Sequence, residues 1–105
     1  MQVVVMIPRP LRRYAEGQAE VTTEGRTVGE VLADLTQRFP LLKEHLYGED
    51  GSLKRFLNIY VEGEDIRYLK GERTRVKNGA TVAIIPAIAG GGGQRSEPVS
   101  VLQRL

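Results

Sequence analysis

The 105-residue sequence predicts an α+β domain in which a mixed sheet of about five strands packs on one main helix. Three observations support this prediction. Short apolar runs of strand type open and close the first 89 residues, and one longer segment has apolar residues at helical spacing. That helical segment follows two strands and has no second long helix after it. The strands therefore outnumber the helices too strongly for a doubly wound sheet.

The first two predicted strands lie at the N-terminal end. Residues 3–7 form a continuous run rich in β-branched side chains, which is typical of a buried strand, and Pro8 and Pro10 end it. Residues 18–23 alternate weakly between apolar and polar side chains. We expect them to form the hairpin partner of the first strand.

The main helix is predicted over residues 27–39. Thr27 and Glu30 have the spacing of a capping box, in which each side chain binds a backbone N–H of the first turn, and Pro40 ends the helix. Residues 41–51 predict only a short helical turn that continues into a loop. The apolar face of the helix consists of Val28, Val31, Leu32, Leu35 and Phe39.

The second half of the sheet is predicted over residues 55–86. Residues 55–69 indicate two strands about a turn at 62–65, and an Asn78-Gly79 turn precedes the last strand. Side chains alternate across a strand, so two opposite faces are expected. Leu57, Ile59 and Val61 share one face with Val82 and Ile84, and Phe56, Asn58 and Tyr60 share the other with Ala83 and Ile85. One helix on one face of such a sheet is a β-grasp, ubiquitin-like arrangement.

Composition excludes several classes of function. Fifteen Lys and Arg against thirteen Asp and Glu give a net charge of +2, which does not favour nucleic acid or an anionic membrane as a partner. The chain has no cysteine, which excludes disulfides, thiol catalysis and Cys-ligated zinc. His45 is the only histidine, and we expect it on a solvated helix face. We therefore predict no catalytic residue and no metal site.

The N-terminal apolar run lacks a basic leader and a cleavage pattern of small residues. We therefore expect a cytoplasmic protein without a spanning helix.

Four consecutive glycines, Gly90 to Gly93, follow the last predicted strand. Such a run removes every side chain and gives the backbone wide freedom, which a packed core does not require. No Lys-Ser/Thr pair follows them, so they do not have the pattern of a phosphate-binding loop. We predict a domain over residues 1–89 and a flexible Gly-rich tail over residues 90–105.

The chain resembles the ThiS/MoaD sulfur carriers over residues 1–91. The segments that carry the resemblance are GRTVGEVL, RFLNIYVEGEDIR and NGATVAIIPAIAGG, and within the family the likeness is greatest to the carrier of cysteine biosynthesis. The resemblance implies that a ubiquitin-activating-like enzyme uses ATP to adenylate a C-terminal glycine carboxylate. The acyl adenylate becomes a thiocarboxylate, which donates sulfide to a biosynthetic enzyme. The carrier itself would be neither an enzyme nor a holder of a bound cofactor.

The sequence departs from the family pattern after the diglycine Gly90-Gly91, because residues 92–105 follow it. A peptide bond after Gly91 leaves no carboxylate to adenylate. The resemblance therefore implies a proform that a JAB/MPN-type zinc metalloprotease cuts between Gly91 and Gly92, with Gly93 as the alternative new terminus. Glycines suit this end because a chain without Cβ atoms can enter a narrow channel, and residues 87–91 could extend on the order of 15 Å.

Other interpretations of the tail and of the product stay open. The tail could be a plain extension of a β-grasp binding module, or residues 96–105 could form a short helix that docks on the body or a partner. The same activated glycine could join the chain to lysines as a protein modifier. A sulfur amino acid such as cysteine is the favoured product, and molybdopterin, thiamine, thiolated tRNA and sulfur-containing secondary metabolites are alternatives.

A partner-binding surface is predicted on the sheet face that turns away from the helix. Its residues are Phe56, Tyr60 and Ile85, with Ile88 beyond the last strand. The alternative is that these side chains only stabilise the strands by cross-strand pairing. Arg9, Arg12 and Arg13 form a basic loop that is expected to be solvated, with docking to an acidic partner as its alternative role.

Overall fold

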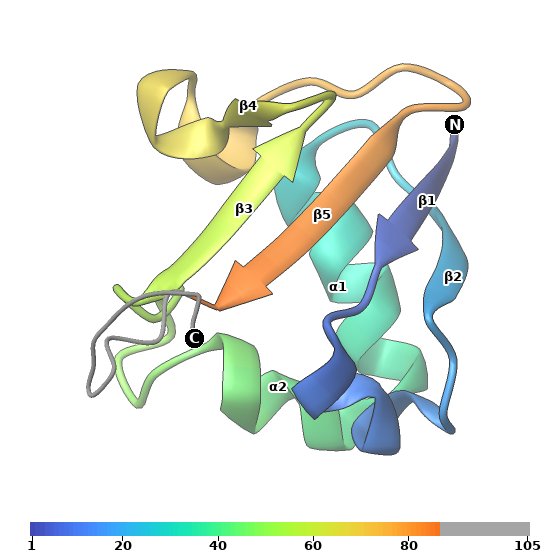
Figure 1. Cartoon of the computed structure of the whole chain (residues 1–105). Helices are drawn as coiled ribbons and strands as arrows, with labels where there is room; N and C mark the ends of the chain where they lie inside the picture. Colours follow the sequence, from blue (N-terminus) through green and yellow to red (C-terminus); the bar gives the residue numbers. More distant parts are fainter. Residues whose placement is uncertain (87–105) are drawn as a thin grey trace, which may run out of the picture.

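The computed structural model describes residues 1–86. These residues form one five-stranded sheet in the order β2-β1-β5-β3-β4, with β5 in the middle. Strands β1 and β5 are parallel and the other neighbouring pairs are antiparallel (Figure 1). The elements are β1 (Gln2–Met6), η1 (Arg9–Ala15), β2 (Glu20–Glu24), α1 (Val28–Arg38), α2 (Pro40–Leu46), β3 (Leu57–Val61), β4 (Glu64–Asp65), η2 (Ile66–Tyr68), η3 (Gly71–Arg73) and β5 (Thr81–Pro86).

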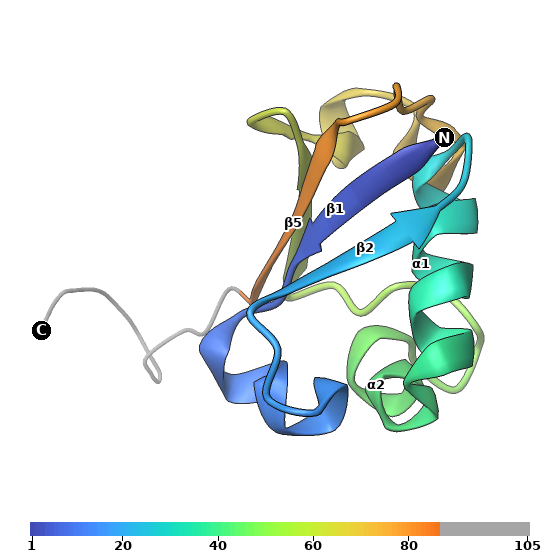
Figure 2. The same ribbon diagram turned by 90° about the vertical axis from the view of Figure 1, so that its right-hand side faces the viewer.

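Both α-helices lie on one side of the sheet, which confirms the predicted α+β, β-grasp architecture (Figure 2). The predicted domain boundary at residue 89 lies outside the described residues. The core forms where α1 packs on the inner sheet face, and each fully buried aliphatic side chain there stabilises the fold by about 1.5–3 kcal/mol. It includes Val3, Val5, Ile59 and Val82 from the strands and Val31, Leu32 and Leu35 from α1.

The capping box at the start of α1 is present with a small shift. The Glu30 N–H donates to Thr27 Oγ1 at 3.2 Å, as predicted. The Glu30 carboxylate accepts from the N–H of Arg26 at 2.8 Å, one residue before the N-cap. Two N–H groups near the helix start are therefore satisfied by side chains.

Pro40 ends α1, and it also begins a second helix. Helix α1 ends at Arg38, and Pro40 is the first residue of α2, a seven-residue helix where the sequence predicted only a helical turn. Proline suits the first position of a helix because its missing N–H would have no intrahelical partner there. Leu42 and Leu46 on α2 are fully buried, so packing stabilises this short helix.

The chain after β3 differs from the prediction. The turn lies at Glu62 and Gly63, whose φ angles of 49° and 84° are both positive, as a type I′ turn requires. The returning strand β4 has only two residues, and the predicted strand beyond Asp65 is wrong because η2 replaces it. The Asp65 side chain accepts from the N–H of Arg67 at 2.8 Å, and this local bond starts the 3-10 turn. Ile66 is then buried against the core.

Two further predictions need correction. The segment of Arg9, Arg12 and Arg13 is the 3-10 helix η1 and not an irregular loop. His45 is half-buried and does not lie on a solvated face. Its ring stacks on Tyr14 of η1 at 4.1 Å between centroids, which joins η1 to α2.

Candidate partner-binding surface at the end of strand β5

The end of β5 is the point from which the C-terminal segment continues. Pro86 is the last residue of β5 and lies opposite Leu57, the first residue of β3. Residues 87–105 follow directly, and they include Ile88 and the glycines Gly90, Gly91, Gly92 and Gly93. These positions lie outside the described residues, so their predicted roles stay predictions.

An apolar patch lies on the outer sheet face next to this end. Met6 on β1 lies beside Ala83 on β5, and Ala83 lies opposite Tyr60 on β3. Ile85 is two residues further along β5, and Phe56 directly precedes β3. Phe56 and Ile85 are 55% and 47% exposed, which is high for side chains of this size. We call Met6, Phe56, Tyr60, Ala83 and Ile85 the outer patch.

The three described residues of the predicted surface lie on β3, on β5 and in the turn before β3, in different settings. Ile85 is in β5 as expected, and Tyr60 on β3 is half-buried. Phe56 lies in a turn before β3, in which the N–H of Leu57 donates to the carbonyl oxygen of Lys54 at 3.1 Å. The Lys54 ammonium lies 6.0 Å from the centroid of the Phe56 ring, at the outer limit of a cation–π contact.

Sequence reasoning missed Met6. Its segment is apolar throughout, so the residue pattern does not distinguish an inner face from an outer one. The structure shows the two faces, because Val3 and Val5 are buried whereas Met6 is 37% exposed. A parallel pairing of the first and last strands would have placed Met6 beside the last strand, but this pairing was not predicted.

A polar cluster of Asn58, Asp65 and Arg67 borders the outer patch on its β3 side. The Arg67 guanidinium donates to Asp65 Oδ2 at 3.0 Å and also to the side-chain oxygen of Asn58. Asn58 lies opposite Ile85, so this cluster touches the patch. The hydrogen bonds from Arg67 lower the pKa of the Asp65 carboxyl and raise the pKa of Arg67 itself. Both groups therefore stay charged at neutral pH.

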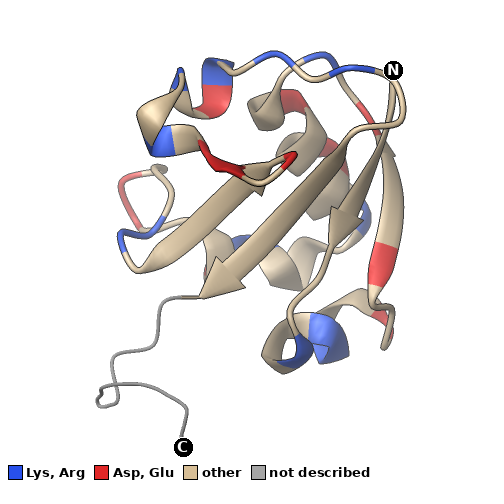
Figure 3. Ribbon diagram, turned by 45° about the horizontal axis from the view of Figure 1, so that its top comes forward, with Lys and Arg blue, Asp and Glu red and all other residues tan. Residues whose placement is uncertain are grey.

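Basic residues lie on both sides of the end of β5 (Figure 3). Lys54 and Arg55 precede β3 on one side, and η1 with Arg9, Arg12 and Arg13 follows β1 on the other. Arg12 is partly fixed, because its Nε donates to the carbonyl oxygen of Ile7 at 2.9 Å. The exposed side chains among these basic residues are accessible to an acidic partner, although exposed charges affect association rates more than affinity.

Other parts of the described chain are less suited to a specific site. A surface depression of about 1210 Å³ is an open groove between α1, α2 and the loop before β3. Its ionisable lining residues are Lys43, Glu44, Glu49 and Lys54, which carry both signs of charge, together with Tyr47. Residues 1–86 contain no group of three or more His, Cys, Asp or Glu that could hold a metal ion. No helix within this range is long and apolar enough to span a membrane.

The fold and the patch define a ubiquitin-like β-grasp protein with an apolar surface beside its C-terminal segment. The sequence profile of the ThiS family matches residues 5–91. The chain therefore belongs to the ThiS family.

Three relatives are similar over nearly their whole length. The sulfur carrier protein CysO of Mycobacterium tuberculosis is 42% identical over 93 residues, which span 87% of this chain and all of that protein. CysO of Amycolatopsis orientalis, solved in a BexX/CysO complex, superposes with a TM-score of 0.78 at 42% identity and covers 85% of this chain and 99% of its own. Small archaeal modifier protein 1 of Methanosarcina acetivorans gives a TM-score of 0.76 at 32% identity, with coverage of 86% and 96%.

Proposed function

We propose that the chain is the proform of a sulfur carrier. After removal of residues 92–105, the carboxylate of Gly91 would be adenylated and converted to a thiocarboxylate that donates sulfide in biosynthesis. The observation that supports this most strongly is where the family likeness ends. The ThiS profile matches up to residue 91, the second glycine of the run, and fourteen residues follow it.

The chemistry requires a free carboxylate at the end of an accessible segment. A carboxylate oxygen attacks the α-phosphorus of ATP, pyrophosphate leaves, and a sulfur nucleophile then displaces AMP from the acyl adenylate. In the proform the same carbonyl carbon is bound in the amide between Gly91 and Gly92. Hydrolysis of that amide must therefore come first. The chain supplies the acyl group, and the partner enzymes supply the catalysis, so the carrier is not itself an enzyme.

The outer patch supports a docking role in this scheme. It lies at the end of β5, so a partner that covers Phe56 and Ile85 would have its active site within reach of residues 87–91. We propose that a ubiquitin-activating-like adenylyltransferase binds there. A JAB/MPN-type zinc metalloprotease would act earlier on the proform, and a sulfur-accepting biosynthetic enzyme would act later. All of these steps would take place in the cytoplasm.

The CysO likeness favours cysteine or a related sulfur amino acid as the product. A second candidate function is conjugation to proteins. Small archaeal modifier protein 3 of Haloferax volcanii is 35% identical over 65 residues, which span 62% of this chain and 70% of that protein. A modifier would use the same activated glycine with a lysine amine as the nucleophile in place of sulfur.

Mass spectrometry of the protein recovered from its native host tests the proposal. A mature carrier is expected to end at Gly91, with a thiocarboxylate form in which one oxygen is replaced by sulfur. Branched diglycine remnants on host proteins would favour the modifier instead. Recovery of only the full-length chain, while the genes of the partner enzymes are expressed, would contradict maturation.

A further inference from the structure

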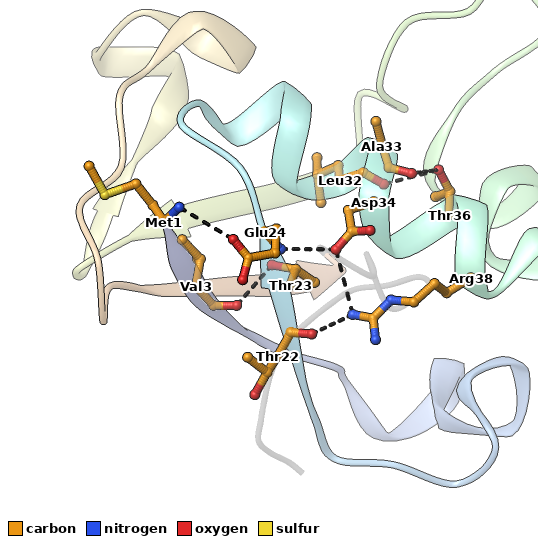
Figure 4. Close-up of polar contacts among 10 residues, drawn as sticks. All are labelled: Met1, Val3, Thr22, Thr23, Glu24, Leu32, Ala33, Asp34, Thr36 and Arg38. Carbon is orange, nitrogen blue, oxygen red and sulfur yellow. Dashed lines mark hydrogen bonds and ion pairs between the residues drawn. The ribbon is translucent and has the colours of Figure 1, made fainter.

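Strand β2 is one edge of the sheet, and side chains from α1 occupy the outer side of that edge. An unpaired edge exposes a row of backbone N–H and C=O groups, to which another chain can add a strand. The residues that meet the β2 edge are Asp34 and Arg38 (Figure 4). This contact is separate from the outer patch and does not depend on the proposed function.

The β1–β2 register shows which backbone groups face outward. The N–H of Ile7 donates to the carbonyl oxygen of Ala19 at 2.8 Å, and the N–H of Gly25 donates to that of Met1 at 3.1 Å. Ala19 and Gly25 flank β2 on its two sides, and in an antiparallel pair every second residue exchanges hydrogen bonds with the neighbouring strand. The backbone groups of the odd-numbered residues of β2 therefore bond to β1. The backbone groups of Glu20, Thr22 and Glu24 therefore point away from the sheet.

Asp34 and Arg38 bind two of these outward groups. The N–H of Glu24 donates to Asp34 Oδ2 at 2.9 Å, and the Arg38 guanidinium donates to the carbonyl oxygen of Thr22. The two side chains lie four residues apart on α1 and form an ion pair at 3.7 Å. Asp34 Oδ2 thus meets both the edge strand and the arginine. An added strand would have to displace both side chains, because it would lie about 4.8 Å from β2.

The charges on β2 oppose self-association as well. If the β2 strands of two copies paired antiparallel with Thr22 at the centre, Glu20 of each copy would lie opposite Glu24 of the other. Both side chains are exposed, and like charges directly opposite each other destabilise strand pairing. Two separate features therefore keep this edge unpaired, and their effects can be separated by substitution.

We propose that the Asp34–Arg38 pair closes the β2 edge of the sheet against strand addition by a second copy of the chain. A second copy then cannot add a strand at β2. A single pair of side chains can do this because β2 has only five residues and three of them face outward. The Asp34–Arg38 pair binds one outward group in the middle of the strand, the carbonyl oxygen of Thr22, and one at its end, the N–H of Glu24.

The test uses a background in which the charges favour pairing. In Glu20→Lys, both cross-strand contacts of an antiparallel pairing about Thr22 become Lys–Glu, so only the Asp34–Arg38 pair would oppose a dimer. We compare E20K with E20K/D34A/R38A by light scattering coupled to size-exclusion chromatography over rising concentration. We expect the mass to double only in E20K/D34A/R38A. The matched control is E20K/K43A/E44A, which removes one acidic and one basic exposed side chain from α2 and should stay monomeric.

Hydrogen exchange gives the second readout. The Glu24 amide should exchange faster in D34A/R38A than in the wild-type chain, and the Thr22 amide should become protected in the dimer of E20K/D34A/R38A. The proposal is overturned if E20K alone dimerises to the same extent, or if E20K/D34A/R38A remains monomeric while circular dichroism shows it folded. A dimer that leaves Thr22 unprotected would also overturn it, because association would then occur elsewhere.

Discussion

The Tyr47 hydroxyl donates a hydrogen bond of 2.9 Å to Glu72 Oε1, and this contact joins the end of α2 to η3. Burial, together with the neighbouring Glu72 carboxylate, raises the pKa of Tyr47. A phenol with a raised pKa in the folded state binds its proton more tightly there than in the unfolded chain. Its contribution to stability is therefore complete below about pH 10, the unfolded value, and decreases as the pH rises above it.

Replacement of Tyr47 by Phe should remove this hydrogen bond and its pH dependence. We expect Tyr47→Phe to lower the free energy of unfolding by about 1 kcal/mol at neutral pH. The difference between wild type and variant should shrink as the pH rises above about 10. Urea unfolding of both proteins between pH 7 and about pH 11 measures this. A difference that stays constant over this range would contradict the raised pKa.

Gly25 is required by close packing at the entry to α1. A Cβ atom at this position would lie 2.8 Å from the backbone nitrogen of Val31 and 3.0 Å from the carbonyl carbon of Glu30. Backbone atoms of a capped helix cannot move aside as a flexible side chain can. We expect Gly25→Ala to destabilise the fold by about 1–3 kcal/mol, as overpacked positions do.

Gly48 provides the matched control for Gly25. A Cβ atom there would lie 3.4 Å from Asp50 Oδ1, an ordinary contact with the end of a side chain. Gly48→Ala should change the free energy of unfolding by no more than about 0.5 kcal/mol. Chemical denaturation of both variants makes the comparison. Equal losses of stability in Gly25→Ala and Gly48→Ala would mean that the close approach at Gly25 is not the cause of the destabilisation.

Periodicity predicted those elements whose structure depends on a repeated apolar pattern. The buried face of α1 and the alternation of β3 and β5 could be predicted because apolar and polar side chains recur there at regular spacing. The 3-10 helices could not. Helix η2 begins where the Asp65 side chain accepts a hydrogen bond from the N–H of Arg67, and such a bond leaves no repeat in the sequence.

The candidate site was predictable to different degrees at its separate positions. Alternation indicated that Tyr60 and Ile85 share a face, and the structure shows both on the outer side of the sheet. Met6 and Arg67 were not predicted at this site. The position of Met6 depends on the pairing of β1 with β5, and that of Arg67 depends on the turn after β4. The roles of the glycines were predicted from the family resemblance, and residues 1–86 do not test these roles.

The outer patch should matter more for binding than for stability. Ile85 is 47% exposed at the end of β5, so a carboxylate there stays solvated and costs the fold little. When a partner covers the patch, the same carboxylate would be buried in an apolar interface without an opposite charge beside it. We expect Ile85→Asp to raise the KM of the activating enzyme for a chain ending at Gly91 by about tenfold or more, equivalent to about 1.4 kcal/mol.

Leu41 provides the comparison for Ile85. It is 61% exposed in the first turn of α2, where an aspartate suits the helix dipole, and it is not part of the outer patch. Leu41→Asp should leave the KM unchanged. Thermal unfolding of both variants checks that they remain folded. A loss of stability in Ile85→Asp as large as its loss of binding would favour a purely structural role for the patch.

A chain ending at Gly91 should be adenylated without any protease. The free carboxylate is then already present, whereas the full-length chain holds the same carbon in an amide bond. We expect the cognate activating enzyme to catalyse ATP–pyrophosphate exchange with the truncated chain and not with the full-length chain. Gly91→Leu in the truncated chain tests the need for a residue without a side chain, because a Cβ atom should hinder entry into a narrow active-site channel. If the truncated chain fails to accept AMP, Gly91 is not the activated residue. If the Leu variant reacts equally well, activation does not require a residue without a side chain at this position.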